Sequence, residues 1–172
     1  LDELSSIVRE ADHLRIPVLA HAESLAAAKD CIRAGVATIE HGEELDDECR
    51  RLMVDKGIIH VPTLQLFVGP WFDEYPPPPR GGLEAFPGDT LVEKEKNRVR
   101  ANFVASLEAG VTIAVGSDSF SSTEVPYGRS TVAEIHTMVD AGMPAADAIV
   151  AATSHGARAL RISHETGAIA PG

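Results

Sequence analysis

The stretch RIPVLAHAESLAAAKDCIRAGVATIEHG, residues 15–42, holds two short apolar runs with a helical segment between them. The runs cover residues 16–20 and 36–40, and their length and continuous apolar character are typical of buried strands. Ser24 stands where a helix N-cap is expected, and Gly35 is the residue that best tolerates the left-handed conformation that ends many helices. The stretch therefore predicts a strand, a helix and a second strand.

The same alternation continues along the rest of the chain. Helices that alternate with short, continuously apolar strands specify a parallel sheet covered on both faces, so the predicted fold class is α/β. The predicted helices are 2–14, 24–34, 46–56, 91–109, 131–141, 145–152 and 157–160, and the predicted strands are 16–20, 36–40, 58–64 and 112–115.

Four such strands fit either an open, doubly wound sheet or half of an eight-stranded barrel, which needs about 250 residues. Neither GxGxxG nor GxxxxGK(S/T) follows any of the strands, and these phosphate-binding sequences would favour the open sheet. A length of 172 residues is sufficient for one domain. We therefore expect one partial barrel domain over residues 1–172.

Composition excludes several classes of protein. The chain has no run of about 18 apolar residues that could span a membrane. Its formal net charge of -11 comes from 26 acidic and 15 basic residues, which disfavours binding to a nucleic-acid backbone. Cys31 and Cys49 cannot form a disulfide scaffold or a CxxC metal site. The sequence leaves the compartment open, with the cytoplasm as the first expectation, and it is compatible with a homo-oligomer.

Residues 66–90 interrupt the alternation. They include four consecutive prolines, 76–79, and five of the eight aromatic residues of the chain, among them Trp71 and Phe72. A loop of this length is uncommon in a compact domain unless it has a function or is a linker. We expect a lid or a pocket wall, with a linker as the alternative.

Three polar residues follow predicted strands at their carboxyl ends. His21 and His41 close the first two strands, and Asp118 follows the fourth strand in the sequence Val-Gly-Ser-Asp-Ser. Ligands and catalytic groups of parallel α/β folds gather at this edge of the sheet. Two imidazoles and a carboxylate are also suitable ligands for a divalent metal such as zinc.

Each of the three residues also has a structural interpretation. A histidine at a strand end is often held by hydrogen bonds, and an aspartate after Gly-Ser often caps a turn or a helix. Their joint placement favours the metal site. The other histidines are scattered: we expect His13 and His164 at the surface, and His60, His136 and His155 in the core or in support of the site.

An ordered series of short motifs resembles the amidohydrolase superfamily, and most closely its imidazolonepropionase-like and Xaa-Pro dipeptidase (prolidase-like) branch. The resemblance covers essentially the whole chain, and the order of the motifs is more specific than any one of them. The motifs are Ala-His-Ala-Glu at 20–23, Ile-Glu-His-Gly at 39–42, Val-Pro-Thr-Leu at 61–64, Gly-Ser-Asp-Ser at 116–119, Ala-Ala-Thr at 151–153 and Gly-Ala-Ile-Ala-Pro-Gly at 167–172.

The resemblance implies the carboxyl-terminal half of a distorted (β/α)8 TIM-like barrel, strands five to eight, with closing helices. It assigns His21 as a metal ligand, His41 as a second ligand or a substrate-polarising group, and Asp118 as the residue that touches the metal and transfers the proton. Residues 167–172 then form the start of a turn into a missing β-sandwich.

Two features of the superfamily are absent from the sequence. No His-x-His pair occurs, and none of the four lysines lies at a predicted strand end, where the family places a metal-bridging lysine. The resemblance places both upstream of Leu1, so we expect a fragment of a longer enzyme. Alone, it should bind metal poorly and hydrolyse little.

The implied activity is hydrolysis of a carbon–nitrogen bond, in a non-peptide amide or a dipeptide, by a water that one or two zinc ions activate. Tyr127 and Arg129 are candidates to bind a substrate carboxylate, and Trp71 and Phe72 to bind an apolar portion. Arg129 could instead pair with a nearby acidic residue. A non-catalytic α/β module, or a lactonase or deaminase on the same scaffold, is the alternative.

Overall fold

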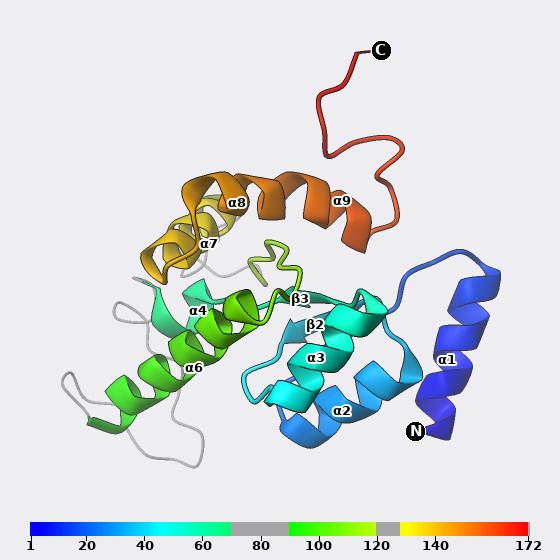
Figure 1. Cartoon of the computed structure of the whole chain (residues 1–172), viewed down its shortest axis with the longest axis horizontal. Helices are drawn as coiled ribbons and strands as arrows, with labels where there is room; N and C mark the ends of the chain where they lie inside the picture. The colour runs from blue at the N-terminus through cyan, green and yellow to red at the C-terminus, as the bar shows by residue number, and fades with distance from the viewer. Residues whose placement is uncertain (70–89, 120–127, 172) are drawn as a thin grey trace.

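The computed structural model describes residues 1–69, 90–119 and 128–171 (Figure 1). Within these ranges, helices and short strands alternate in the first part of the chain, and helices follow in the second part. The elements are α1 (Asp2–His13), β1 (Leu19–Ala22), α2 (Leu25–Ala34), β2 (Thr38–His41), α3 (Asp47–Lys56), β3 (Ile59–Val61), α4 (Gln65–Val68), α6 (Thr90–Glu108), α7 (Arg129–Asp140), α8 (Ala145–Val150), a π-helical turn (Ala151–His155) and α9 (Gly156–Ala159).

The strands form one parallel sheet in the order β1-β2-β3, which confirms the predicted α/β class. Residue His21 of β1 lies beside Glu40 of β2, and Glu40 lies beside Val61 of β3. Figure 1 shows α2 and α3 on one side of these strands and the run from α8 to α9 on the other. The three described strands do not by themselves close a barrel.

The predicted fourth strand, 112–115, is wrong as a full strand. The segment pairs with β3 only at a single bridge between His60 and Ile113. Two backbone bonds of 2.9 Å form there, from the His60 amide to the Thr112 carbonyl and from the Ala114 amide to the His60 carbonyl. The next donor of a parallel ladder would be residue 62, which is a proline and has no N–H, so the ladder ends.

Helix ends follow the local chemistry of the sequence. The Ser24 hydroxyl caps α2 by accepting a bond from the Ala27 amide, and Gly35 ends the helix at a φ of +88°. Asp46 caps α3 through the Cys49 amide, and Gly57 ends it at a φ of +69°. These caps confirm the predicted boundaries of the two helices to within one residue.

The closing helices form one continuous run instead of the two separate helices predicted over 145–152 and 157–160. A π-helical turn over Ala151–His155 joins α8 to α9. The turn is tied to the fourth sheet segment, because the Val115 amide donates to the Ala151 carbonyl at 3.2 Å and the His155 ring bonds the Ile113 carbonyl at 2.7 Å. These bonds come from the edge of segment 112–115 that faces away from β3.

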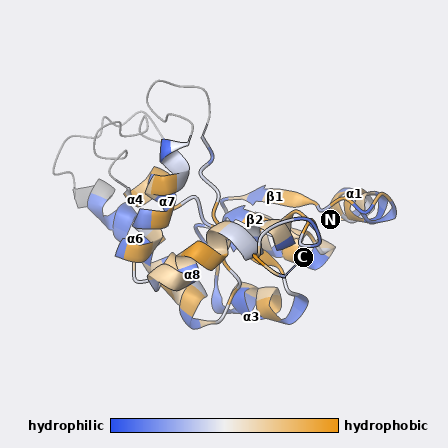
Figure 2. Ribbon diagram, turned by 90° about the horizontal axis from the view of Figure 1, so that it is seen from above, coloured by the Kyte–Doolittle hydropathy of each residue, from blue (hydrophilic) through white to orange (hydrophobic). Residues whose placement is uncertain are grey.

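The core lies between the sheet and the helices that cover it. Hydrophobic and hydrophilic residues alternate along α3 and α6, as expected for helices with one buried side (Figure 2). A second, smaller cluster on the opposite face joins Ile59, Val61, Ala114 and Ala159. None of the helices in the described ranges is both long and apolar enough to cross a membrane. The largest fully buried apolar side chains are Phe103, Ile32, Ile39, Met53, Leu64 and Met138.

Candidate metal and catalytic site

His21 and His41 meet at the carboxyl ends of neighbouring strands. Their rings contact edge to face, with centroids 4.4 Å apart and planes at 73°. The register explains the contact, because Ala22 lies beside His41 in the parallel ladder and both strands end at the same edge. The His21 side chain is 66% exposed, whereas His41 is buried. The two candidate imidazoles therefore lie side by side at one edge of the sheet.

The orientation of the His41 ring is fixed by Thr63. Ring nitrogen Nδ1 lies 2.7 Å from the Thr63 hydroxyl, which follows β3. The Phe67 ring stands edge-on to His41 at a centroid distance of 6.2 Å. Metal-binding histidines usually have their other ring nitrogen held by such a partner. With Nδ1 engaged by Thr63, Nε2 is the nitrogen through which His41 would bind a metal.

Three strand-end residues have a left-handed backbone, which is uncommon outside glycine. The φ angles are +65° at His41, +46° at Thr63 and +46° at Asp118. For a β-branched residue such as Thr63 this conformation is an outlier. Strained backbone of this kind clusters at functional sites, where the surrounding structure holds it in place. The three residues follow β2, β3 and the segment 112–115, so this edge of the sheet is the candidate site.

The turn after His41 is held from several sides. The His60 ring donates from Nε2 to the His41 carbonyl at 2.8 Å. Asn102 of α6 donates to the Gly42 carbonyl at 2.5 Å. A side chain at position 42 would be blocked as well, because a β-carbon there would lie 2.9 Å from His60 Nε2. His60 is thus a buried residue that holds the backbone directly after His41.

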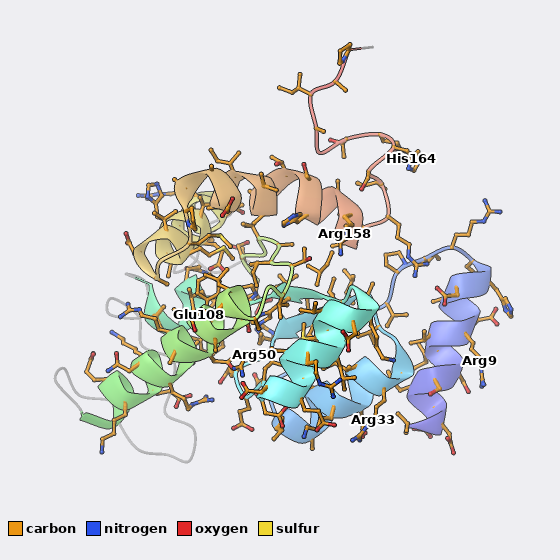
Figure 3. All side chains as sticks on the ribbon, viewed as in Figure 1. Arg9, Arg33, Arg50, Glu108, Arg158 and His164 are labelled. Atoms are coloured by element: carbon orange, nitrogen blue, oxygen red, sulfur yellow. The ribbon has the colours of Figure 1, made fainter. Side chains whose placement is uncertain are left out.

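Two arginines complete the support of this turn. Arg98 of α6 donates to the Glu43 carbonyl at 2.7 Å and pairs with the Glu43 carboxylate at 3.1 Å. Arg50 extends from α3 toward α6 (Figure 3) and donates to the Asn102 side-chain oxygen at 2.5 Å. The His41 turn is therefore braced by side chains of two helices that flank it.

His60 is neutral in the folded protein. Burial lowers the pKa of its imidazole to about 4, and the positive charge of Arg50 acts in the same direction. The bond to the His41 carbonyl opposes the shift without reversing it. A neutral ring with its proton on Nε2 is the form that this bond requires.

Asp118 stands in an exposed turn whose position depends on a close backbone contact. A β-carbon at Gly116 would lie 2.4 Å from Val61 Cγ1, so only glycine allows the turn to approach β3 so closely. The Gln65 side chain donates to the Ser117 carbonyl at 3.2 Å and fixes the residue before Asp118.

Glu40 is a member of the site that the sequence analysis missed. It is half-buried on the same sheet face as Thr38, whose hydroxyl bonds its carboxyl group. Burial raises the pKa of Glu40; the Thr38 bond opposes this, Asp118 adds to it, and His21 opposes it. These charge effects show that Glu40 lies within electrostatic reach of both candidates. The sequence feature that could have identified Glu40 is the presence of a glutamate at the end of the apolar run 36–40.

Within the described ranges, no three His, Cys, Asp or Glu side chains are close enough together to hold a metal ion. The structure therefore brings His21 and His41 together as two nitrogen donors, and Asp118 does not complete a group of three with them. Two imidazoles fit part of a zinc site, which takes three or four ligands. The donors found among the described residues are compatible with part of a metal site.

Of the four residues predicted to bind substrate, only Arg129 lies in the described part of the chain. Trp71, Phe72 and Tyr127 lie outside the described residues, as does most of the predicted lid. Arg129 begins α7 and is exposed. It lines a surface hollow of about 470 Å³ that includes Val132 and His136 but none of the metal-site candidates.

Comparison with known proteins identifies relatives over nearly the whole chain. Ochratoxinase of Aspergillus niger is 30% identical over 165 residues, which cover 90% of this chain and 30% of the relative. A solved Xaa-Pro dipeptidase with methionine bound in its active site has a TM-score of 0.79 at 30% identity, covering 99% of this chain and 40% of that one.

The crystal structure of Aspergillus niger ochratoxinase has a TM-score of 0.76 at 29% identity, covering 96% of this chain and 35% of that one. The chain thus spans less than half the length of each of these relatives. The sequence pattern of the Amidohydrolase family matches residues 1–172 in full. The chain belongs to the amidohydrolase family.

Proposed function

We propose that residues 1–172 form strands five to eight and the closing helices of a (β/α)8 barrel in a metal-dependent hydrolase of carbon–nitrogen bonds. The observation that carries the proposal is the contact of the His21 and His41 rings, 4.4 Å apart at neighbouring strand ends. The bond from His41 Nδ1 to Thr63 supports it, because it presents Nε2 as a ligand atom.

His21 and His41 would hold the divalent ion, with zinc as the metal that best suits imidazole ligands in a hydrolase. When bound, such an ion supplies Lewis-acid activation of a water molecule and of the substrate carbonyl. The remaining ligands would come from chain outside residues 1–172. This proposal accounts for two donors in a set that needs three or four.

Asp118 would act as the general base and then as the general acid. Its exposed carboxylate can accept a proton from the attacking water and return it to the leaving nitrogen. The left-handed backbone at Asp118 and the bond from Gln65 to Ser117 fix where this carboxylate stands. A carboxylate placed in this way serves both steps without a second proton carrier.

The proposed substrates are small amides or dipeptide-like molecules. Support comes from what the similar proteins are called, an Xaa-Pro dipeptidase and an ochratoxinase. Arg129 could bind a substrate carboxylate by paired hydrogen bonds, and the aromatic residues Trp71 and Phe72 remain predictions for an apolar portion.

The test is Asp118→Asn in the full-length enzyme, assayed with a panel of N-acyl amino acids and Xaa-Pro dipeptides. We expect turnover to fall by about 10²–10⁴-fold with KM within a few-fold, because an amide cannot carry the proton and general acid–base catalysis typically contributes that much. Asp30→Asn is the control, since Asp30 is an exposed carboxylate on α2 that pairs with Arg33 at 3.5 Å. Activity of Asp118→Asn within tenfold of the wild type contradicts the assignment.

A further inference from the structure

A carboxylate that the proposed mechanism does not use lies in the core beside the site. Glu134 of α7 has no exposed surface. One carboxylate oxygen accepts the Leu64 amide at 2.8 Å and the other accepts the Gln65 amide at 2.6 Å. Burying a charged side chain is rare, because the loss of hydration costs free energy unless hydrogen bonds compensate for it. The two bonds join parts of the chain about 70 residues apart.

The two amides that Glu134 holds come directly after Thr63. Their positions determine how the backbone leaves Thr63, which has the left-handed φ of +46°. Thr63 in turn bonds His41 Nδ1 through its hydroxyl at 2.7 Å. Glu134 therefore stabilises the conformation in which the Thr63 hydroxyl reaches the His41 ring.

Glu134 is also linked to the backbone before Asp118, through Gln65. Glu134 holds the Gln65 amide, and the Gln65 side chain donates to the Ser117 carbonyl at 3.2 Å. Ser117 directly precedes Asp118. One buried carboxylate is thus linked to the end of β3, where Thr63 bonds His41, and to the end of segment 112–115, which Asp118 follows.

We infer that Glu134 is a positioning residue that sets the orientation of the His41 ring through Thr63 and the place of Asp118 through Gln65. The inference rests on the proposed hydrolytic function for its catalytic consequence. Glu134 touches neither reacting group, and it acts only through the backbone that it holds. A carboxylate is suited to this role because its two oxygens accept two adjacent N–H donors at once.

The decisive variant is Glu134→Gln. Glutamine has the same shape but only one acceptor oxygen, so its NH₂ group would face one of the two backbone N–H donors. Thr137→Val is the matched control, because Thr137 is also buried on α7 and its hydroxyl bonds only within the helix, to the Ala133 carbonyl at 2.8 Å. Both variants remove a buried polar contact of the same helix.

The first readout is ¹⁵N and ¹H NMR of the full-length protein, which requires no activity. In the wild type and in Thr137→Val, we expect slow amide exchange at Leu64 and Gln65 and a His41 ring with one dominant tautomer. In Glu134→Gln, we expect amide exchange at least tenfold faster at these two residues and a mixture of His41 tautomers. Unchanged exchange and an unchanged His41 ring in Glu134→Gln would overturn the inference.

The second readout is steady-state kinetics of the full-length enzyme. We expect kcat of Glu134→Gln to fall at least tenfold with KM within threefold, while Thr137→Val keeps both. A kcat equal to that of Thr137→Val overturns the catalytic part of the inference. An enzyme without hydrolytic activity in the wild type, but with the NMR changes above, overturns the proposed function and leaves the positioning by Glu134 intact.

Gln65→Leu tests the two arms separately and remains informative if Glu134→Gln fails to fold. It removes the bond to the Ser117 carbonyl but keeps the backbone amide that Glu134 accepts. We expect the His41 tautomer to stay as in the wild type while the Ser117 and Asp118 amide signals shift. A shift of the His41 ring as large as that of Asp118 would refute the assignment of separate arms.

Discussion

Gly116 has no space for a side chain, and this gives a sharp test of how the Asp118 turn is placed. A β-carbon at this position would lie 2.4 Å from Val61 Cγ1, whereas nonbonded carbons are most stable about 3.5–4.0 Å apart. Val61 is buried in β3, so it cannot swing away into solvent. We therefore expect Gly116→Ala to destabilise the fold and to push the turn that carries Asp118 away from the sheet.

The expected loss follows from two opposing terms. Overpacking a well-filled core costs about 1–3 kcal/mol, and an overlap of more than about 1 Å belongs in the upper half of that range. Replacing glycine by alanine also restricts the unfolded chain, which favours folding by about 0.4–1 kcal/mol. The φ angle of Gly116 is not left-handed, so no backbone strain is added. The net loss in the free energy of unfolding should be about 2 kcal/mol.

Urea unfolding followed by circular dichroism measures this loss, with Gly156→Ala as the control. The nearest atom to a β-carbon at Gly156 is the Ala151 carbonyl oxygen at 3.9 Å, so this change should leave the stability equal or up to about 1 kcal/mol higher. Adding Val61→Ala removes the blocking methyl group and should recover about 1–2 kcal/mol in a double-mutant cycle. If Gly116→Ala is as stable as Gly156→Ala, or if Val61→Ala brings no relief, the steric explanation is refuted.

Two further outcomes are expected. In the full-length enzyme, Thr63→Val should lower metal affinity by about 10–100-fold, because it removes the hydroxyl that orients His41. Thr63→Ser keeps the hydroxyl and should keep the affinity. Chelator competition measures both affinities, and equal values for the two variants contradict the expectation. Burial raises the pKa of Glu134 to about 7 from an ordinary value of 4.5, against two backbone bonds that lower it. The favourable contribution of its neutral form is therefore complete below pH 4.5 and is lost as the pH rises through 7, by about 3 kcal/mol. Unfolding of Glu134→Gln should lack this slope, and the same slope in both proteins would rule out Glu134 as its source.

The placement of His21 and His41 could be predicted because it depends on local rules. Each apolar run is short, each is followed by a helix with a clear cap, and parallel neighbours end at the same edge of a sheet. Ser24, Gly35 and Gly57 behave as the sequence indicates. None of these features requires knowledge of contacts between distant parts of the chain.

The fourth strand and the π-helical turn show where local rules fail. The apolar run 112–115 has the composition of a strand, but the partner strand offers a proline at the position where the ladder needs a donor. On the opposite edge of the segment, the Val115 amide donates to the Ala151 carbonyl of the π-helical turn. A pattern within one segment carries no information about the donors of its neighbour.

The supporting residues of the site could not be predicted for the same reason. Glu134 lies on a helix whose sequence gives no sign of a buried carboxylate, and its partners Leu64 and Gln65 are about 70 residues away. The role of Thr63 in holding the His41 ring follows only from the tertiary contact between the two side chains. The groups that hold the site are defined by tertiary contacts, whereas the candidate ligands are defined by strand ends.

The proposed function offers an explanation for the left-handed backbone at this edge of the sheet. Arg15 and Arg161 also have a left-handed backbone, but each follows a helix, where that conformation is an ordinary way to end the helix. His41, Thr63 and Asp118 follow sheet segments instead, and each such residue costs about 1–3 kcal/mol.

Glycine would remove most of this cost at any of the three positions, and the chain does use glycine at Gly42 and Gly116 in the same turns. At His41, Thr63 and Asp118 the proposed function requires the side chain itself, for a ring nitrogen, a hydroxyl and a carboxylate. The strain is then borne by the groups that hold these turns, Asn102 and His60 on one side and Glu134 with Gln65 on the other. The folded state is therefore less stable than it would be with glycine at these three positions, where the proposed chemistry requires a side chain.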